Sequence, residues 1–129
     1  GFRELLQWKA ADMIQPDVSW AGGFGECLRI AQESANLHIP TWPHQAGTPW
    51  GLHLTACLPL PAMAETFGLN HSSWTQSIES EIYHRLRPQP KDGLFRLNDL
   101  PGFGLDLSPE LLDAYAVDTV IIKKHKKRN

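Results

Sequence analysis

The sequence has few cysteines, little excess charge of either sign and no long apolar run, and each shortage excludes a class of protein. Its two cysteines, Cys27 and Cys57, are not spaced as a metal knuckle or a redox motif. Both fall among apolar residues of predicted helices, so we expect buried free thiols, which favour a reducing, cytoplasmic setting. The formal net charge of −2 excludes a strongly basic nucleic-acid surface over the whole chain. No apolar run approaches the roughly 18 residues of a membrane span.

The residues that are present fit one globular domain that is too short for a complete α/β barrel. The chain has 129 residues, of which 42% are hydrophobic and 20% charged, so it can bury a core. A complete eight-stranded α/β barrel needs about 250 residues. Because the sequence begins at Gly1 inside a helical pattern, we expect that an N-terminal portion is missing.

Three short apolar runs alternate with helical patterns, and an acid-base residue follows or ends each run. The predicted strands cover residues 11–15, 38–42 and 62–67. The acid-base residues are Asp17, His44 and Glu65. A strand–helix–strand unit takes roughly 30 residues, which is close to the separation between Asp17 and His44. Such repeats lay parallel strands side by side, so the three polar side chains should meet at the rim formed by the C-terminal strand ends.

The helices are indicated by apolar periodicity and by capping residues. From Phe24 to Ala35, apolar residues recur at three- and four-residue steps. Thr48 and Pro49 form a cap and a first-turn proline before a helix at 50–58, and Ser108 with Pro109 does the same before a helix to about Ala116. The remaining predictions are a helix end at 2–10, a turn at 91–93, an irregular stretch at 70–80, a last strand at 117–122 and a basic tail at 123–129.

The rim residues have the chemical types needed for proton transfer. If Asp17 and His44 end adjacent parallel strands about 4.8 Å apart, the carboxylate can reach one imidazole nitrogen. It would fix the tautomer and raise the proton affinity of the ring, leaving the other nitrogen to act as a general base or acid. Glu65, if protonated, can hydrogen-bond a substrate carboxylate and stabilise developing negative charge.

Each rim residue also has an ordinary interpretation. An Asp after a proline is usually a turn residue or a helix cap, a His after a proline can be a loop residue, and a Glu at a strand end is usually solvated. Their joint placement at consecutive strand ends favours chemistry. Trp20, Trp42 and Trp50 lie near the rim and can line a substrate pocket, although tryptophans beside strands are more often core residues.

The other histidines and the basic tail carry weaker signals. His53 falls on a predicted helix, and no spacing among His71, His84 and His125 builds a metal site, so surface or packing roles are expected. The tail at 123–129 can attract phosphate, but a single basic run without aromatic residues is more typical of a solvated end.

Two sequence stretches resemble a known family. The run from Ala11 to Gly23, ADMIQPDVSWAGG, and the run from Ile39 to Gly47, IPTWPHQAG, resemble the C-terminal part of the mandelate racemase/muconate lactonizing enzyme branch of the enolase superfamily. The later runs RPQPKDGLF and DLPGFGLDL resemble the same proteins, especially their acid-sugar dehydratases. The resemblance covers nearly the whole chain.

The resemblance implies a fold, a site and a cofactor. The fold is α/β: residues 1–68 form about three βα units of a TIM-type (β/α) barrel, strands six to eight, and residues 69–129 belong to a capping domain. Asp17 and His44 match the family's catalytic dyad, and Glu65 matches the acid after the eighth strand. Trp20 and Trp42 are candidates for substrate binding because of their place near the rim, not because of the resemblance. The family removes the proton next to a substrate carboxylate with the help of Mg²⁺, and the dehydratases then lose a hydroxyl group.

The resemblance also implies that this chain is incomplete. The family's metal ligands would lie upstream of Gly1, so the chain contains none of them and should be inactive alone. We expect as partners a sugar-acid substrate, the missing N-terminal portion or a complementary chain, and further copies in a homo-oligomer, but neither nucleic acid nor membrane. Two alternatives stay open: a racemase or epimerase of 2-hydroxy acids that uses the same dyad, and a non-catalytic interaction module.

Overall fold

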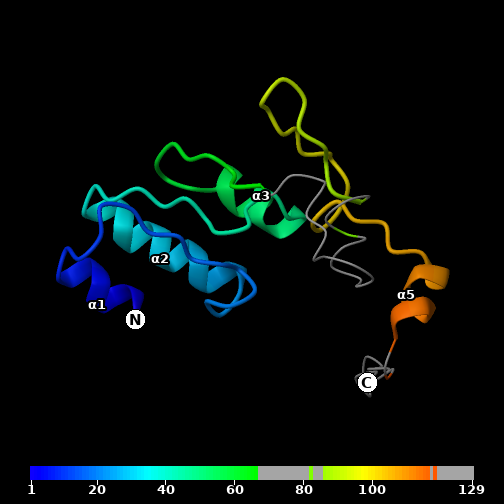
Figure 1. The fold of residues 1–129 in the computed structure, drawn as a ribbon, viewed down its shortest axis with the longest axis horizontal. Helices are drawn as coiled ribbons and strands as arrows, with labels where there is room; N and C mark the ends of the chain where they lie inside the picture. Colours follow the sequence, from blue (N-terminus) through cyan, green and yellow to red (C-terminus); the bar gives the residue numbers. More distant parts are fainter. Residues whose placement is uncertain (67–81, 83–85, 117, 119–129) are drawn as a thin grey trace, which may run out of the picture.

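The computed structural model describes residues 1–66, 82, 86–116 and 118. The described helices are α1 (Phe2–Gln7), α2 (Phe24–Asn36), α3 (Pro49–Ala56) and α5 (Pro109–Tyr115). Helices α1 and α2 pack side by side, and α3 contacts α2 (Figure 1). The predictions for 70–80, for most of 117–122 and for the tail 123–129 lie outside the described residues.

Helix α2 is the longest described helix and carries the core. It has 13 residues, and no helix in the described part of the chain is long and apolar enough to cross a membrane. Ile30 of α2 packs with Leu6 of α1 and with Ile14 in a buried cluster. The predicted helix from Phe24 is confirmed. Its buried face is rotated slightly from the predicted stripe and consists of Cys27, Ile30, Ala31 and Ser34.

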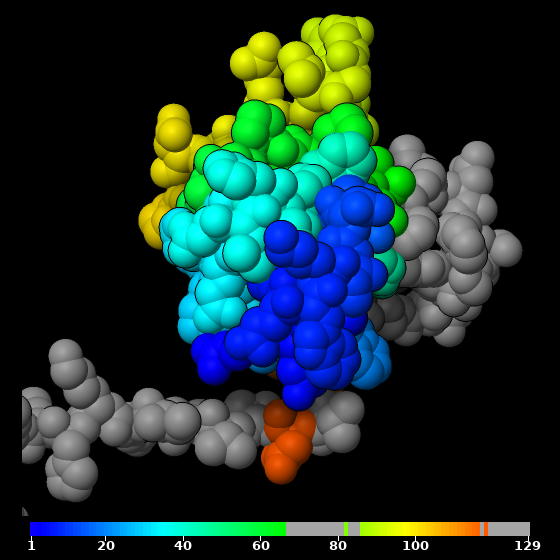
Figure 2. Space-filling model, turned by 90° about the vertical axis from the view of Figure 1, so that its left-hand side faces the viewer, coloured from blue at the N-terminus to red at the C-terminus, as the bar shows by residue number. Residues whose placement is uncertain are grey.

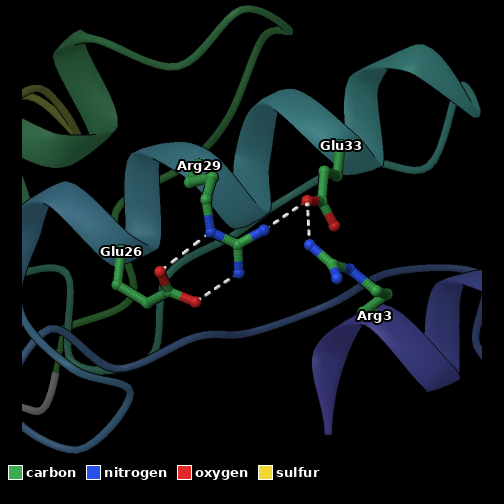
Figure 3. Close-up of polar contacts among 4 residues, drawn as sticks. All are labelled: Arg3, Glu26, Arg29 and Glu33. Carbon is green, nitrogen blue, oxygen red and sulfur yellow. Dashed lines mark hydrogen bonds and ion pairs between the residues drawn. The ribbon is translucent and has the colours of Figure 1, made fainter.

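A network of charged side chains joins the exposed faces of α1 and α2. Arg29 forms ion pairs with Glu26 and Glu33 on its own helix, and Arg3 of α1 reaches Glu33 at 3.3 Å (Figure 3). Hydrogen bonds from Arg29 are the main cause that lowers the pKa of Glu26. Because these groups are exposed, solvent screening limits their contribution to stability.

The first two predicted strands pair in parallel, but only through an isolated bridge. Ile14 bridges Thr41, and its amide donates to the carbonyl of Pro40 at 3.1 Å while its carbonyl accepts from the amide of Trp42 at 3.0 Å. The parallel neighbourhood was predicted correctly, whereas continuous strands at 11–15 and 38–42 were not. Prolines at positions 16, 40 and 43 lack the amide hydrogens that a longer ladder would need.

The third predicted strand is extended chain without a ladder. Residues 62–66 have no assigned strand, and Phe67 lies outside the described residues. The segment is tied to its neighbour by one backbone bond, in which the amide of Gly47 donates to the carbonyl of Glu65 at 2.7 Å. The described residues therefore contain no regular sheet, and the barrel remains an expectation from the sequence resemblance.

Helix α3 begins as predicted and ends earlier. The Thr48 hydroxyl accepts from the amide of Gly51 at 3.1 Å, and Pro49 occupies the first turn. The helix ends at Ala56, and Cys57, its C-cap, is exposed. The prediction of a buried Cys57 was therefore wrong, because the residue lies beyond the end of the buried helical face. Cys27 is buried, as predicted, and both thiols are free.

The C-terminal described segment contributes isolated contacts rather than a core. Lys91 and Leu94 exchange both backbone hydrogen bonds at 2.9 Å around Asp92 and Gly93, whose φ angles are 52° and 76°. This is the predicted turn, in the left-handed geometry that suits Asp-Gly. Phe103 packs its ring near that of Phe24, with centroids 5.8 Å apart. Helix α5 has the predicted Ser108 cap, but none of its residues is buried.

The N-terminal part of the chain and helix α5 differ in how they are packed. The N-terminal segments and the helices they form make one continuous mass (Figure 2), and α5 lies away from helices α1, α2 and α3 (Figure 1). The rim residues lie in the continuous part, where backbone contacts hold the chain segments that carry them.

Candidate active site

Asp17 begins a tight loop that fixes its own carboxylate. One side-chain oxygen, Oδ1, accepts from the amide of Ser19 at 2.7 Å, and the Asp17 carbonyl accepts from the amide of Ala21 at 2.7 Å. The loop then passes through Gly22 and Gly23 at φ 101° and 91°, values that favour glycine. The second carboxylate oxygen, Oδ2, is held toward the neighbouring segment.

His44 lies across from Asp17 on that neighbouring segment. The backbone amide of His44 donates to the Pro16 carbonyl at 3.3 Å, and its ring Nδ1 lies 3.0 Å from Asp17 Oδ2. A carboxylate only accepts, so Nδ1 carries the hydrogen in this contact and Nε2 can accept a proton. The two side chains differ in exposure, at 12% for Asp17 and 42% for His44. The carboxylate is thus the less exposed partner, and the imidazole is the more accessible one.

Glu65 completes the row on the Nε2 side of His44. Its Oε2 lies 3.8 Å from His44 Nε2, too far for a hydrogen bond but close enough for electrostatic interaction. The same oxygen accepts from the amide of Gln45 at 2.9 Å. The structure therefore brings together Asp17, His44 and Glu65, as their positions after the three apolar runs predict.

The structure does not test the predicted role of Trp20 and Trp42 in substrate binding. Trp20 is 87% exposed on the loop that follows Asp17. Trp42 is half-buried two residues before His44, and its indole Nε1 has no hydrogen-bond partner among the described residues. Their proposed contacts with substrate remain predictions.

His53 has a packing role in the structure. Its Nδ1 lies 2.7 Å from the Pro49 carbonyl within α3, and its ring meets that of Phe103 edge-on at 5.6 Å between centroids. These contacts agree with the predicted helix-packing role. His71, His84 and His125 lie outside the described residues.

The rim residues do not fit a magnesium site. Within the described residues, no group of three or more His, Cys, Asp or Glu side chains is arranged to hold a metal ion. Mg²⁺ requires a nearly octahedral set of oxygen ligands. Here both Asp17 side-chain oxygens are engaged, one by the Ser19 amide and one by His44. The Asp17 carboxylate is therefore not free to supply an oxygen ligand to Mg²⁺ in this arrangement.

Sequence reasoning missed Arg87, which lies behind the row. The side chain is buried at 4% exposure, and its Nη1 donates to the Gly47 carbonyl at 3.0 Å and to the Thr66 hydroxyl at 2.7 Å. Its guanidinium carbon sits 5.6 Å from the centre of the Phe95 ring. The only signal in the sequence is the RPQPKDG run that begins at Arg87, which shows family resemblance but not this contact.

The comparisons with known proteins agree with the motif resemblance. Residues 1–111 match the family described as enolase C-terminal domain-like. The chain is 32% identical over 114 residues to a putative L-rhamnonate dehydratase of Caldivirga maquilingensis, covering 87% of this chain and 28% of that protein. It is 32% identical over 112 residues to an L-rhamnonate dehydratase of Saccharopolyspora erythraea, covering 86% and 28%.

The chain thus spans less than a third of the length of these curated relatives. No solved structure matches it significantly. The family match covers most of the sequence, including all three rim residues. The chain belongs to the enolase C-terminal domain-like family, and its relatives include acid-sugar dehydratases of the enolase superfamily.

Proposed function

We propose that this chain is the C-terminal part of a magnesium-dependent acid-sugar dehydratase. The observation that carries the proposal is the Asp17–His44–Glu65 row, found in a chain whose relatives are named L-rhamnonate dehydratases. The substrate would be a sugar acid, of which L-rhamnonate is the first candidate. Residues 1–68 would supply the last three βα units of a TIM-type barrel, and residues 69–129 would belong to a capping domain.

The proposed reaction removes water from a 2,3-dihydroxy acid. The α-carbon loses its proton, the bond between the β-carbon and its hydroxyl breaks, and the hydroxyl leaves as water. The resulting enol rearranges to a 2-keto-3-deoxy acid. Both proton movements need a group that can gain and release a proton near neutral pH, and imidazole is the side chain best suited to this.

In this scheme His44 is the general base or acid, and Asp17 orients it. With Nδ1 bound to Asp17 at 3.0 Å, the ring is held so that Nε2 points away from the Asp17 carboxylate. When Nε2 takes up a proton, the ring becomes a cation, and the adjacent carboxylate stabilises it. Glu65 on the same side, when protonated, would donate a hydrogen bond to the substrate carboxylate and stabilise negative charge that develops there.

The metal would be bound by residues outside this chain, since the rim row does not fit Mg²⁺. Its chemistry would be Lewis-acid stabilisation of negative charge on the substrate. The chain alone would then be inactive until it is joined to the remaining part of the barrel. The complete protein is expected to form a homo-oligomer.

The test is replacement of His44 in the full-length protein that carries this chain. His44→Asn keeps a polar side chain of similar size but removes the group that gains and releases the proton, so dehydration should be abolished. His38→Asn is the matched control, because His38 is exposed at φ 58°, a conformation that asparagine tolerates. Near wild-type dehydration by His44→Asn would overturn the assignment.

A different outcome would identify the racemase or epimerase alternative. That reaction exchanges the α-proton with solvent deuterium without loss of water. Exchange without dehydration by the wild-type protein would contradict the dehydratase while keeping the dyad. The relatives' names favour dehydration.

A further inference from the structure

We propose that Arg87 is a positioning residue that holds Glu65 and the 45–47 loop in place beside His44. The functional part of this inference rests on the proposed dehydratase. Arg87 lies 40 residues from Gly47 in sequence, yet its Nη1 binds the Gly47 carbonyl, so the C-terminal segment reaches directly into the structure that supports the rim.

Two direct hydrogen bonds, and two more through Arg87, connect the 45–47 loop to the segment that carries Glu65. The Gln45 amide donates to Glu65 Oε2 at 2.9 Å, and the Gly47 amide donates to the Glu65 carbonyl at 2.7 Å. Arg87 Nη1 closes the set by donating both to the Gly47 carbonyl and to the hydroxyl of Thr66, the next residue after Glu65. One guanidinium nitrogen therefore bridges the two segments whose relative position sets the distance between Glu65 and His44.

The burial of Arg87 makes the bridge depend on a guanidinium group. A buried cation requires hydrogen-bond acceptors, and the donors of a guanidinium lie in a fixed planar arrangement. Nη1 of Arg87 has a backbone carbonyl and a hydroxyl as acceptors, and the guanidinium carbon lies 5.6 Å from the centre of the Phe95 ring. Lysine would supply a point charge without the fork, so it could keep one of the two Nη1 contacts but not the same geometry.

Gly47 is shaped to receive the guanidinium. A Cβ added at this position would lie 2.5 Å from Arg87 Nη1 and 2.8 Å from the Thr66 hydroxyl. Alanine at 47 would therefore push the tip of the Arg87 side chain away and break the bridge from its other side. Two chemically different substitutions, at Arg87 and at Gly47, should have the same consequence.

The first test measures activity in the full-length protein. Displacement of a positioned group by about 1 Å can lower the rate about 100-fold, so Arg87→Lys, Arg87→Ala and Gly47→Ala should each lower kcat by up to about that factor. Because Arg87 does not touch substrate, KM should change much less than kcat. Arg96→Ala, which removes an exposed arginine of the same segment, is the matched control and should leave both parameters unchanged.

Two readouts separate positioning from general destabilisation. Millimolar guanidinium chloride should partly restore kcat in Arg87→Ala and should not affect Arg96→Ala. Combining Gly47→Ala with Arg87→Ala should cost little more than either change alone, since both break one bridge. If Arg87→Ala does not fold, Arg87→Lys and Gly47→Ala decide the question. Unchanged kcat in these two folded variants would overturn the proposal.

A third readout does not need activity. Hydrogen exchange measured by mass spectrometry on peptides covering residues 45–47 should be faster in Arg87→Lys than in wild type, because the Gln45 and Gly47 amides lose their fixed acceptor. Equal exchange rates would overturn the positioning role. If the wild-type protein dehydrates no sugar acid, the proposed function fails, and the exchange experiment still decides the role of Arg87.

Discussion

The N-terminal region, residues 1–66, and the C-terminal described region, residues 86–118, use their apolar residues in different ways. Among the described residues, the first contains almost all of the buried hydrophobic side chains, including Ile14, Ile30 and Leu54. In the second, Leu94, Leu100 and Leu112 are exposed. The N-terminal region therefore builds the rim from its own packing, whereas the C-terminal region supplies single side chains, notably Arg87. The rim residues are therefore positioned by the N-terminal region, and the C-terminal region adds a contact that supports them.

The largest expected difference between the two regions is in the effect on kcat of replacing one aspartate in each. Asp17→Asn in the full-length protein should lower kcat by about 100- to 10,000-fold, the usual range for a lost acid-base contribution. An amide can accept from Nδ1 but cannot stabilise the charged ring. Asp106→Asn, at an exposed site in the C-terminal region, is the control and should leave kcat unchanged. Equal rates for wild type and Asp17→Asn would remove Asp17 from the mechanism.

A second contrast concerns stability. Ile30 is buried in the core cluster, so Ile30→Ala should lower the free energy of unfolding by about 2–5 kcal/mol. Leu112 on α5 is exposed, and Leu112→Ala should change it by less than about 0.5 kcal/mol. Urea denaturation followed by circular dichroism measures both. Comparable losses from the two substitutions would show that α5 is packed as tightly as α2.

Alkylation of the two cysteines changes the protein least and shows directly which thiol is buried. Burial, reinforced by Asp17 and Glu26, raises the pKa of Cys27 from its ordinary value of 9.0 to about 11. Iodoacetamide at pH 8 should therefore modify the exposed Cys57 and leave Cys27 intact until the chain unfolds. Peptide mass mapping with and without urea makes the comparison. Rapid modification of Cys27 in the native protein would contradict the packing of α2.

The raised pKa of Cys27 also makes the free energy of unfolding depend on pH at high pH. Between about pH 9 and 11 the unfolded chain loses the Cys27 proton while the folded chain keeps it. The free energy of unfolding should therefore fall as pH rises through this range. Replacement of Cys27 by Ala should remove that part of the pH dependence.

Local chemistry made several features predictable from sequence. The Thr48 and Ser108 caps and the Asp92-Gly93 turn depend on residues a few positions apart, and each forms as expected. The meeting of Asp17 with His44 was also predictable, because the two apolar runs before them lie in parallel, although they pair only through the Ile14–Thr41 bridge.

Other features depend on context that sequence patterns do not carry. The apolar runs predicted continuous strands, but prolines at 16, 40 and 43 interrupt the ladder. Cys57 lies among apolar neighbours, yet the helix ends one residue before it. The contact between Arg87 and Gly47 joins segments 40 residues apart, so no local pattern announces it.

The most direct test of the central claim is a proton NMR time course of a sugar acid, beginning with L-rhamnonate, in deuterium oxide. The full-length wild-type protein should remove the α-proton signal as a 2-keto-3-deoxy product forms, with Mg²⁺ present. The His44→Asn variant should leave the substrate spectrum unchanged under the same conditions. Formation of product by His44→Asn at a rate near that of wild type would contradict the account.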